Sequence, residues 1–134
     1  MVVFKALANA SKRSGLSLRL LFNVAYAEST LRPNVITRRD GVVTARGLVQ
    51  INPRYQDSLV RRYMPWLHPS NFDWANAEQN ALLGALYLAD LIKKRGEWGG
   101  VCSYSCGEGR FLELVKHGRR LPKETEDYWK RVLG

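Results

Sequence analysis

The segment Leu20–Thr30 (LLFNVAYAEST) carries a carboxylate where an apolar helix would place its next core residue. Leu21, Val24 and Ala25 follow the i, i+3, i+4 spacing of a helix face turned toward a core, and Glu28 falls at i+7. At the C-terminal end of a helix the dipole disfavours negative charge, and partial burial disfavours it further. Both raise a carboxyl pKa, as a general acid requires. Glu28 is therefore the candidate catalytic acid, the alternative being an ordinary solvated glutamate.

A second carboxylate that could act together with Glu28 is hard to find nearby. Only Asp40 comes early enough in the chain, and it lies in an Asp40-Gly41 pair flanked by β-forming residues. Such a pair is typical of a hairpin turn, so a turn-forming aspartate is the simpler interpretation.

The elements that must position Glu28 are mostly helical. Ser17 is a good N-cap for the helix that ends near Glu28, and the following Pro33 forbids further helix. Asn52-Pro53 predicts the start of another helix, and Asp73 and Gly96 would begin and end a long one. The expected helices cover 4–12, 17–28, 53–63, 73–96, about 110–118 and 122 onward. A further short helix is expected after Gly96, and SYSCGEGR (103–110) is expected to be a turn between it and the helix near Arg110. The fold class is mainly α: a compact helical domain with a small irregular or β insert after the second helix.

Length and composition place the chain among globular proteins. It has 134 residues and a hydrophobic fraction of 46%, which predicts a single domain over residues 1–134. No apolar run approaches the roughly 20 residues that cross a bilayer, so we expect no stable membrane insertion. The first 15 residues do not resemble a secretory signal. We expect a cytoplasmic protein, one that leaves the cell by another route, or one whose signal was removed.

The net charge of +9 is concentrated in the first half of the chain. Up to Trp66, 11 Lys or Arg against 3 Asp or Glu give +8, and the remainder gives +1. A basic half attracts polyanions such as nucleic acid, anionic lipid or bacterial cell wall, although solubility alone explains it equally well. Because no helix shows the basic face with interleaved aromatics of a nucleic-acid reader, we expect no nucleic-acid partner.

The two cysteines do not indicate a metal site. Cys102 and Cys106 lie one helical turn apart, a spacing that suits a disulfide poorly. His68 and His117 are the only histidines, and neither has finger-like spacing. We expect two reduced thiols, no metal and no cofactor.

Five segments, taken in order, resemble one known family. They are AYAESTLRP, ARGLVQINP, NALLGALYLADLI, SYSCGEGRF and LPKETEDYWKRVL, which together span nearly the whole chain. Each is weak by itself, but their common order and compatible spacing resemble the soluble lytic transglycosylase domain of the lysozyme-like superfamily. The resemblance implies an α+β lysozyme-like fold.

The resemblance also implies a reaction. Members of the family cleave the β-1,4 bond between N-acetylmuramic acid and N-acetylglucosamine in peptidoglycan. Glu28 matches the family's catalytic acid, which protonates the glycosidic oxygen and then accepts the proton of the muramyl 6-hydroxyl. That hydroxyl closes a 1,6-anhydro ring through an oxocarbenium-like transition state. One acid is then sufficient, because the substrate supplies its own nucleophile.

Further residues carry over by position as substrate-binding candidates. Ser29 either orients the acid or the sugar or is structural, Gly47 would allow close backbone approach to substrate, and Gln50 would lie near the acid in the cleft. Tyr104 could place its ring on a sugar, with core packing as the alternative for it and for Tyr128.

Two positions depart from the family pattern. Val49 replaces the usual methionine and changes the pocket's shape. Ser105, also a substrate-binding candidate, replaces the usual asparagine and offers only a hydroxyl. Both departures concern substrate fit rather than the proton chemistry of Glu28.

Three function classes stay open at this point. The first is a transglycosylase that acts as a monomer on peptidoglycan glycan strands. The second is a hydrolytic lysozyme (muramidase or endolysin) on the same fold, and the third is a basic module that binds a polyanion without catalysis. The expected place of action is the bacterial cell wall, and the small basic chain suits a bacteriophage lysin or a virion-associated enzyme.

Overall fold

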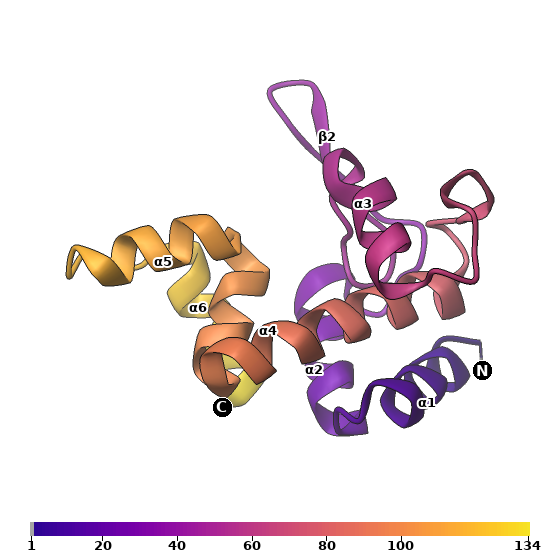
Figure 1. The fold of residues 1–134 in the computed structure, drawn as a ribbon, viewed down its shortest axis with the longest axis horizontal. Helices are drawn as coiled ribbons and strands as arrows, with labels where there is room; N and C mark the ends of the chain where they lie inside the picture. The colour runs from indigo at the N-terminus through magenta and orange to yellow at the C-terminus, as the bar shows by residue number, and fades with distance from the viewer. Residues whose placement is uncertain (1) are drawn as a thin grey trace. The chain divides into compact units, whose positions relative to one another are not determined.

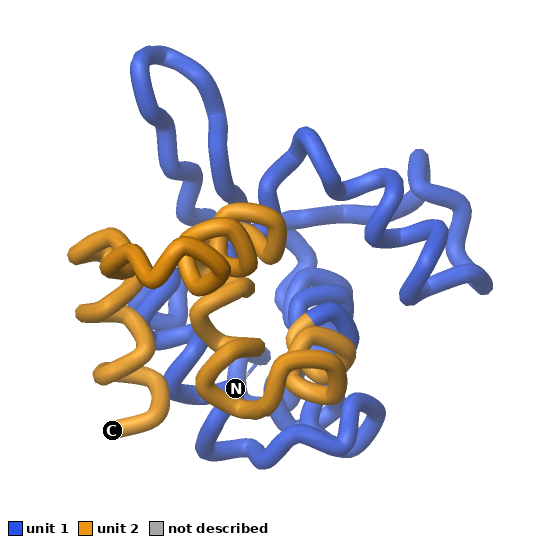
Figure 2. The backbone as a smooth tube through the Cα atoms, turned by 60° about the vertical axis from the view of Figure 1, so that its left-hand side comes forward, with its two compact units in different colours: residues 1–87 blue, residues 88–134 orange. Residues whose placement is uncertain are grey.

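The computed structural model describes residues 2–134, which form six α-helices, a short 3₁₀ turn and one two-stranded hairpin (Figure 1). The chain divides into two compact units, residues up to 87 and residues 88–134, and the division falls inside the longest helix (Figure 2). The elements are α1 (Val2–Ser14), α2 (Leu18–Ser29), β1 (Ile36–Arg39), β2 (Val42–Arg46), α3 (Pro53–Tyr63), η1 (Pro69–Asn71), α4 (Ala77–Cys106), α5 (Glu108–Lys116) and α6 (Lys123–Leu133). The predicted mainly α class with a small β insert after the second helix is confirmed.

Helix α2 begins and ends as its sequence predicts. The Leu20 N–H donates to the Ser17 hydroxyl at 3.1 Å, which confirms Ser17 as the N-cap. At the other end Thr30 and Leu31 take positive φ angles of 52° and 64°, and their N–H groups donate to the last helical carbonyls. The helix therefore stops sharply one residue after Glu28.

The insert is an antiparallel hairpin that extends outward beside α3 (Figure 1). Asp40 and Gly41 have φ angles of 52° and 78°, the paired positive values that a two-residue type I′ turn requires. Ile36 faces Arg46 and Arg39 faces Val42, with a bulge after Thr37. Asp40 thus forms the turn at the hairpin tip, as the simpler interpretation predicted.

Helix α3 begins with the predicted cap and proline. The side chain of Asn52 accepts the Arg54 N–H at 2.9 Å, and Pro53 is the first helical residue.

Helix α4 departs from prediction at its start. It begins at Ala77, where the Gln79 N–H donates to Asn76 Oδ1 at 3.0 Å, so the predicted Asp73 cap is wrong. The Asp73 carboxylate instead accepts the Ala75 N–H at 3.0 Å in the preceding turn. Gly96, with φ 81°, breaks the helix as predicted, and the helical segment expected after it continues to Cys106.

The segment SYSCGEGR is helical rather than a turn, which corrects a further prediction. Only Gly107 leaves helical geometry, at φ 93°, and α5 begins directly after it. Within this second unit Trp98 meets the rings of Phe111 and Trp129 edge-on, at centroid distances of 5.4 and 6.4 Å. A short glycine break thus lets consecutive helices pack around one aromatic cluster.

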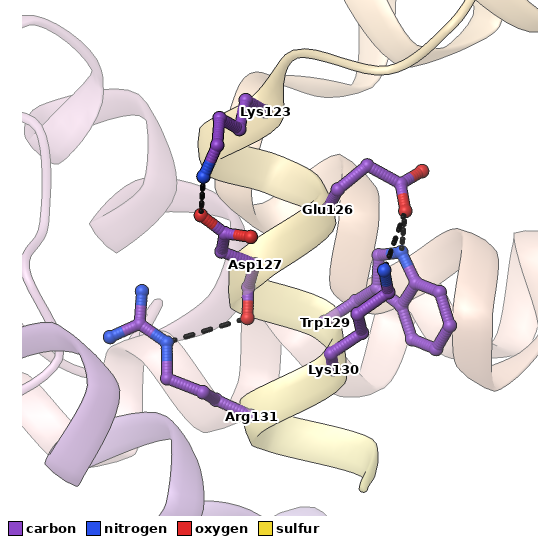
Figure 3. A network of polar contacts seen from close by, with 6 residues as sticks. All are labelled: Lys123, Glu126, Asp127, Trp129, Lys130 and Arg131. Atoms are coloured by element: carbon purple, nitrogen blue, oxygen red, sulfur yellow. Dashed lines mark hydrogen bonds and ion pairs between the residues drawn. The ribbon is translucent and has the colours of Figure 1, made fainter.

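Helix α6 carries a network of polar side chains on its surface (Figure 3). Lys123 and Asp127 pair at 3.0 Å, and Glu126 accepts the indole N–H of Trp129 at 3.2 Å. The hydrogen bond from Lys123 lowers the pKa of Asp127, and the nearby Lys130 and Arg131 act in the same direction. The buried side of the helix presents Thr125, Tyr128 and Val132.

Candidate active site

Glu28 lies in the last turn of α2 and is half-buried. The residues that precede it on the same stripe, Leu21, Val24 and Ala25, are all buried, which confirms the predicted core face. No basic side chain occupies the last turn of this helix. The carboxyl group therefore sits at the edge of a core, at the negative end of a helix dipole, as its pattern indicated.

Ser29 ties the end of α2 to the loop that follows the hairpin. Its side chain is 3% exposed, and its hydroxyl donates to the Leu48 carbonyl at 2.7 Å, with the Ala25 carbonyl at 3.1 Å. The same oxygen accepts the Arg32 N–H at 3.1 Å. These contacts favour the structural interpretation of Ser29, because its buried hydroxyl both donates and accepts hydrogen bonds within the protein.

The loop after the hairpin is closed by a pair of backbone hydrogen bonds. Arg46 and Ile51 exchange N–H···O bonds of 2.9 Å, which enclose the four residues Gly-Leu-Val-Gln. Gly47 has φ 89°, and a Cβ there would meet the side chain of Asn80 and lie 2.7 Å from the Trp74 carbonyl oxygen. Glycine is thus required at position 47 by close approach of the protein itself, a cause that differs from the predicted contact with substrate.

The side chain of Gln50 spans the hairpin and the loop. Its oxygen accepts the Thr37 hydroxyl at 2.6 Å, and its amide nitrogen donates to the carbonyls of Val35 and Gly47 at 3.1 and 3.0 Å. The residue holds φ 58°, a left-handed value that costs a non-glycine residue about 1–2 kcal/mol. The amide therefore locks the loop against the hairpin.

Asn80, on the first turns of α4, is a site residue that sequence reasoning missed. It is fully buried, accepts the Val49 N–H at 2.8 Å, and donates to the Arg46 carbonyl at 3.1 Å. The signal was present: Asn80 precedes Leu83, Gly84 and Tyr87 by three, four and seven residues, which puts a polar side chain on the predicted core stripe. A buried amide needs partners, and here they are loop backbone.

An open hollow of about 470 Å³ follows α2 along the chain, lined by Arg32, Pro33, Asn34, Val35 and Ile36. The guanidinium Nε of Arg32 donates to the Ser29 carbonyl and the Thr30 hydroxyl, at 3.2 and 3.0 Å. The lining of the hollow therefore combines apolar side chains with one hydrogen-bonded guanidinium.

Three predicted site residues belong to the second unit. Tyr104 and Ser105 are half-buried on the last turns of α4, and Tyr128 is buried on α6. The Ser105 hydroxyl lies 3.2 Å from the hydroxyl of Thr125, so it links α4 to α6. The burial of Tyr128 favours core packing, the alternative that its sequence left open.

Residues 2–134 show neither a disulfide nor a cluster of metal-ligating side chains. No group of three or more His, Cys, Asp or Glu is arranged there to hold a metal ion, and both cysteines are free. Burial raises the pKa of the Cys102 thiol to about 12 and also raises that of Cys106. Neither thiol is therefore a nucleophile near neutral pH. No helix in the described part of the chain combines the length and apolarity needed to cross a bilayer.

The first unit thus presents one half-buried carboxyl at a sharply ended helix, next to a loop held by amide hydrogen bonds. Such an arrangement can donate a proton to a leaving oxygen and take one back.

Comparison with known proteins gives a consistent result. The family described as the transglycosylase SLT domain matches residues 5–126. The solved structure of an inactive variant of the lytic transglycosylase Slt from Pseudomonas aeruginosa aligns with a TM-score of 0.71 and 24% identity, over 96% of this chain and 20% of the other. The 70 kDa soluble lytic transglycosylase from Escherichia coli aligns with a TM-score of 0.77 and 22% identity, over 96% and 22%. The chain thus spans about a fifth of each structure, and the likeness shows a shared fold. A search of curated proteins found no match.

Proposed function

Since the chain belongs to the transglycosylase SLT domain family, we propose that it is a peptidoglycan lytic transglycosylase. It cleaves the β-1,4 bond between N-acetylmuramic acid and N-acetylglucosamine and leaves 1,6-anhydro ends. The observation that carries the proposal is the placement of Glu28, half-buried in the last turn of α2 and joined through Ser29 to the loop of the second family motif.

Glu28 acts first as the acid. Its proton goes to the glycosidic oxygen as the bond from the muramyl C1 to that oxygen breaks, and N-acetylglucosamine leaves with a free 4-hydroxyl. The muramyl 6-hydroxyl then bonds to C1 and gives its proton to the Glu28 carboxylate, which restores the acid. No water and no second carboxylate take part, in agreement with the role of Asp40 as a turn residue at the hairpin tip.

The other candidates divide by what their side chains contact. Ser29, Gly47 and Gln50 hold the loop and the end of α2, so we assign them to positioning the acid. The half-buried Tyr104 and Ser105 are our candidates for contact with the glycan. Tyr128 is buried on α6, so we assign it to core packing.

We propose further that both compact units form one catalytic domain. The family match runs from residue 5 to residue 126 and so covers most of each unit. The inactive variant of the Pseudomonas aeruginosa enzyme has a glutamate replaced by glutamine. An essential glutamate in that protein supports a catalytic glutamate here.

Digestion of purified peptidoglycan tests the reaction. Mass spectrometry of the released muropeptides should find anhydro-ended products, each lighter by one water than the reducing-ended product of a hydrolase. Glu28→Gln should lower the rate by at least about 10²–10⁴-fold, the range that general acid catalysis supplies. Reducing-ended products would instead assign the chain to the lysozymes, and full activity of Glu28→Gln would remove Glu28 from the mechanism.

The proposed place of action is the bacterial cell wall, where the substrate lies. A bacteriophage source, a lytic role and a monomeric state stay predictions of the sequence. Detection of the protein in purified virions and its mass by light scattering are the direct tests.

A further inference from the structure

The amide of Asn80 contacts the loop after the hairpin at two points, on either side of Gly47 and Leu48. Its oxygen accepts the N–H of Val49, and its nitrogen donates to the carbonyl of Arg46. Asn80, Leu48 and Val49 are all buried. Because a buried peptide N–H left unsatisfied is costly, these contacts fix the loop in one conformation.

The chemistry of the two contacts is specific for asparagine among side chains of this size. The Arg46 carbonyl already accepts the Ile51 N–H at 2.9 Å, and the Asn80 nitrogen takes its remaining lone pair. An aspartate would keep the acceptor for Val49 but turn a carboxylate oxygen toward the Arg46 carbonyl. An apolar residue would leave the Val49 N–H unsatisfied and would leave the Arg46 carbonyl with only its bond from Ile51.

Leu48, which lies between the two groups that Asn80 contacts, also holds the end of α2. The carbonyl of Leu48 accepts the hydroxyl of Ser29 at 2.7 Å, and Ser29 follows Glu28 directly. A continuous path of short, buried hydrogen bonds thus leads from α4 through the loop to the residue next to the acid. Every member of the path lies in the first unit.

We propose that Asn80 is a positioning residue for the reaction, which acts through Leu48 and Ser29 to fix the carboxyl of Glu28. The inference rests on the function proposed above. It extends that function from the acid to the buried amide that holds it, 52 positions later in the sequence. Because a misplacement of about 1 Å can cost on the order of 10²-fold in rate, loosening the loop lowers kcat even though Asn80 never contacts the glycan.

The test compares Asn80→Asp, Ser29→Ala and the double variant, with Asn76→Ala as the matched control. Asn76 caps α4 one turn earlier, so its loss weakens the same helix without touching the loop. Rates on soluble glycan strands give kcat and KM separately, at a temperature well below every Tm. Hydrogen exchange of the Val49 amide reports on the loop independently of activity.

We expect Asn80→Asp to lower kcat at least about tenfold with KM little changed, and the Val49 amide to exchange faster. The double variant should lose little more than Asn80→Asp alone, because both changes break one path. Asn76→Ala should retain the wild-type kcat.

The proposal fails if Asn80→Asp keeps the wild-type kcat, if the two losses multiply independently, or if Asn76→Ala loses as much. Should Asn80→Asp not fold, Asn80→Ser, which retains one hydrogen bond, is measured by the same criteria. The wild-type digestion product is determined first. A wild-type enzyme without anhydro products refutes the proposed function, whereas an active enzyme indifferent to Asn80 refutes only this inference.

Discussion

Replacing Gly47 by alanine tests whether the loop beside Glu28 is held by close packing. A Cβ at position 47 would lie 2.7 Å from the Trp74 carbonyl oxygen and 2.7 Å from Cγ of Asn80, and nearer still to the Asn80 amide nitrogen. The carbonyl belongs to the backbone and cannot rotate away. The Asn80 amide can move only by releasing Arg46 or Val49.

The cost has two parts. The positive φ of 89° costs an alanine about 1–2 kcal/mol. Breaking either contact of Asn80 leaves a buried polar group unsatisfied, the Asn80 amide nitrogen in one case and the Val49 N–H in the other, at about 1–3 kcal/mol. Together they predict a loss of about 2–5 kcal/mol, out of a typical total of 5–15 kcal/mol. At about 3 °C per kcal/mol for a chain of this length, Tm should fall by about 6–15 °C.

Thermal unfolding followed by circular dichroism measures this shift, with Gly15→Ala as the control. Gly15 has a similar φ of 81°, but nothing lies within 4 Å of its added Cβ, so only backbone strain should appear. The reasoning is refuted if Gly47→Ala lowers Tm no more than Gly15→Ala does.

Three further predictions concern the surface and the second unit. Because the pKa of Cys102 is raised to about 12, its thiol should resist iodoacetamide at pH 8 until the protein unfolds; mass spectrometry of native and denatured samples checks this. Because Lys123 lowers the pKa of Asp127, the pair stabilises the fold above the ordinary aspartate pKa, and this contribution is lost as pH falls through the lowered value. Asp127→Asn should therefore lower Tm slightly at pH 7 and not at pH 2. Arg61→Glu, on the exposed face of α3, should weaken sedimentation with peptidoglycan sacculi at low salt, and the difference should shrink near 0.5 M salt, where charges are screened.

Local sequence signals located most elements of the fold. Ser17, the Asp40-Gly41 pair and Asn52-Pro53 act through contacts within a few residues, so their effects were readable from the sequence. The wrong prediction for the start of α4 also concerns contacts within a few residues, because both Asp73 and Asn76 are suitable N-cap residues. Asn76 is the cap observed, and Gln79 reaches back to donate its N–H to Asn76 and accept the Asp73 N–H.

The site was less predictable because its contacts join distant segments. Ser29 bonds to a carbonyl 19 residues later, and Asn80 reaches backbone groups 31 and 34 residues earlier. Periodicity marks Asn80 as core-facing but does not identify what it meets there. A motif likewise suggested that Gly47 and Gln50 lie near a glycan, but it did not indicate the protein groups that each of them meets.

Backbone strain around the loop gives a reason for the residue types found there. Gln50 keeps a positive φ that glycine would adopt freely, yet glycine would forfeit three hydrogen bonds to Thr37, Val35 and Gly47. At about 1 kcal/mol each, those bonds exceed the strain of about 1–2 kcal/mol. The strained conformation persists because the amide is needed to hold the loop. One cause thus explains the strain at Gln50, the required glycine at position 47 and the buried amide at position 80. The loop is packed so tightly that the end of α2, which is bonded to it, is held in one position.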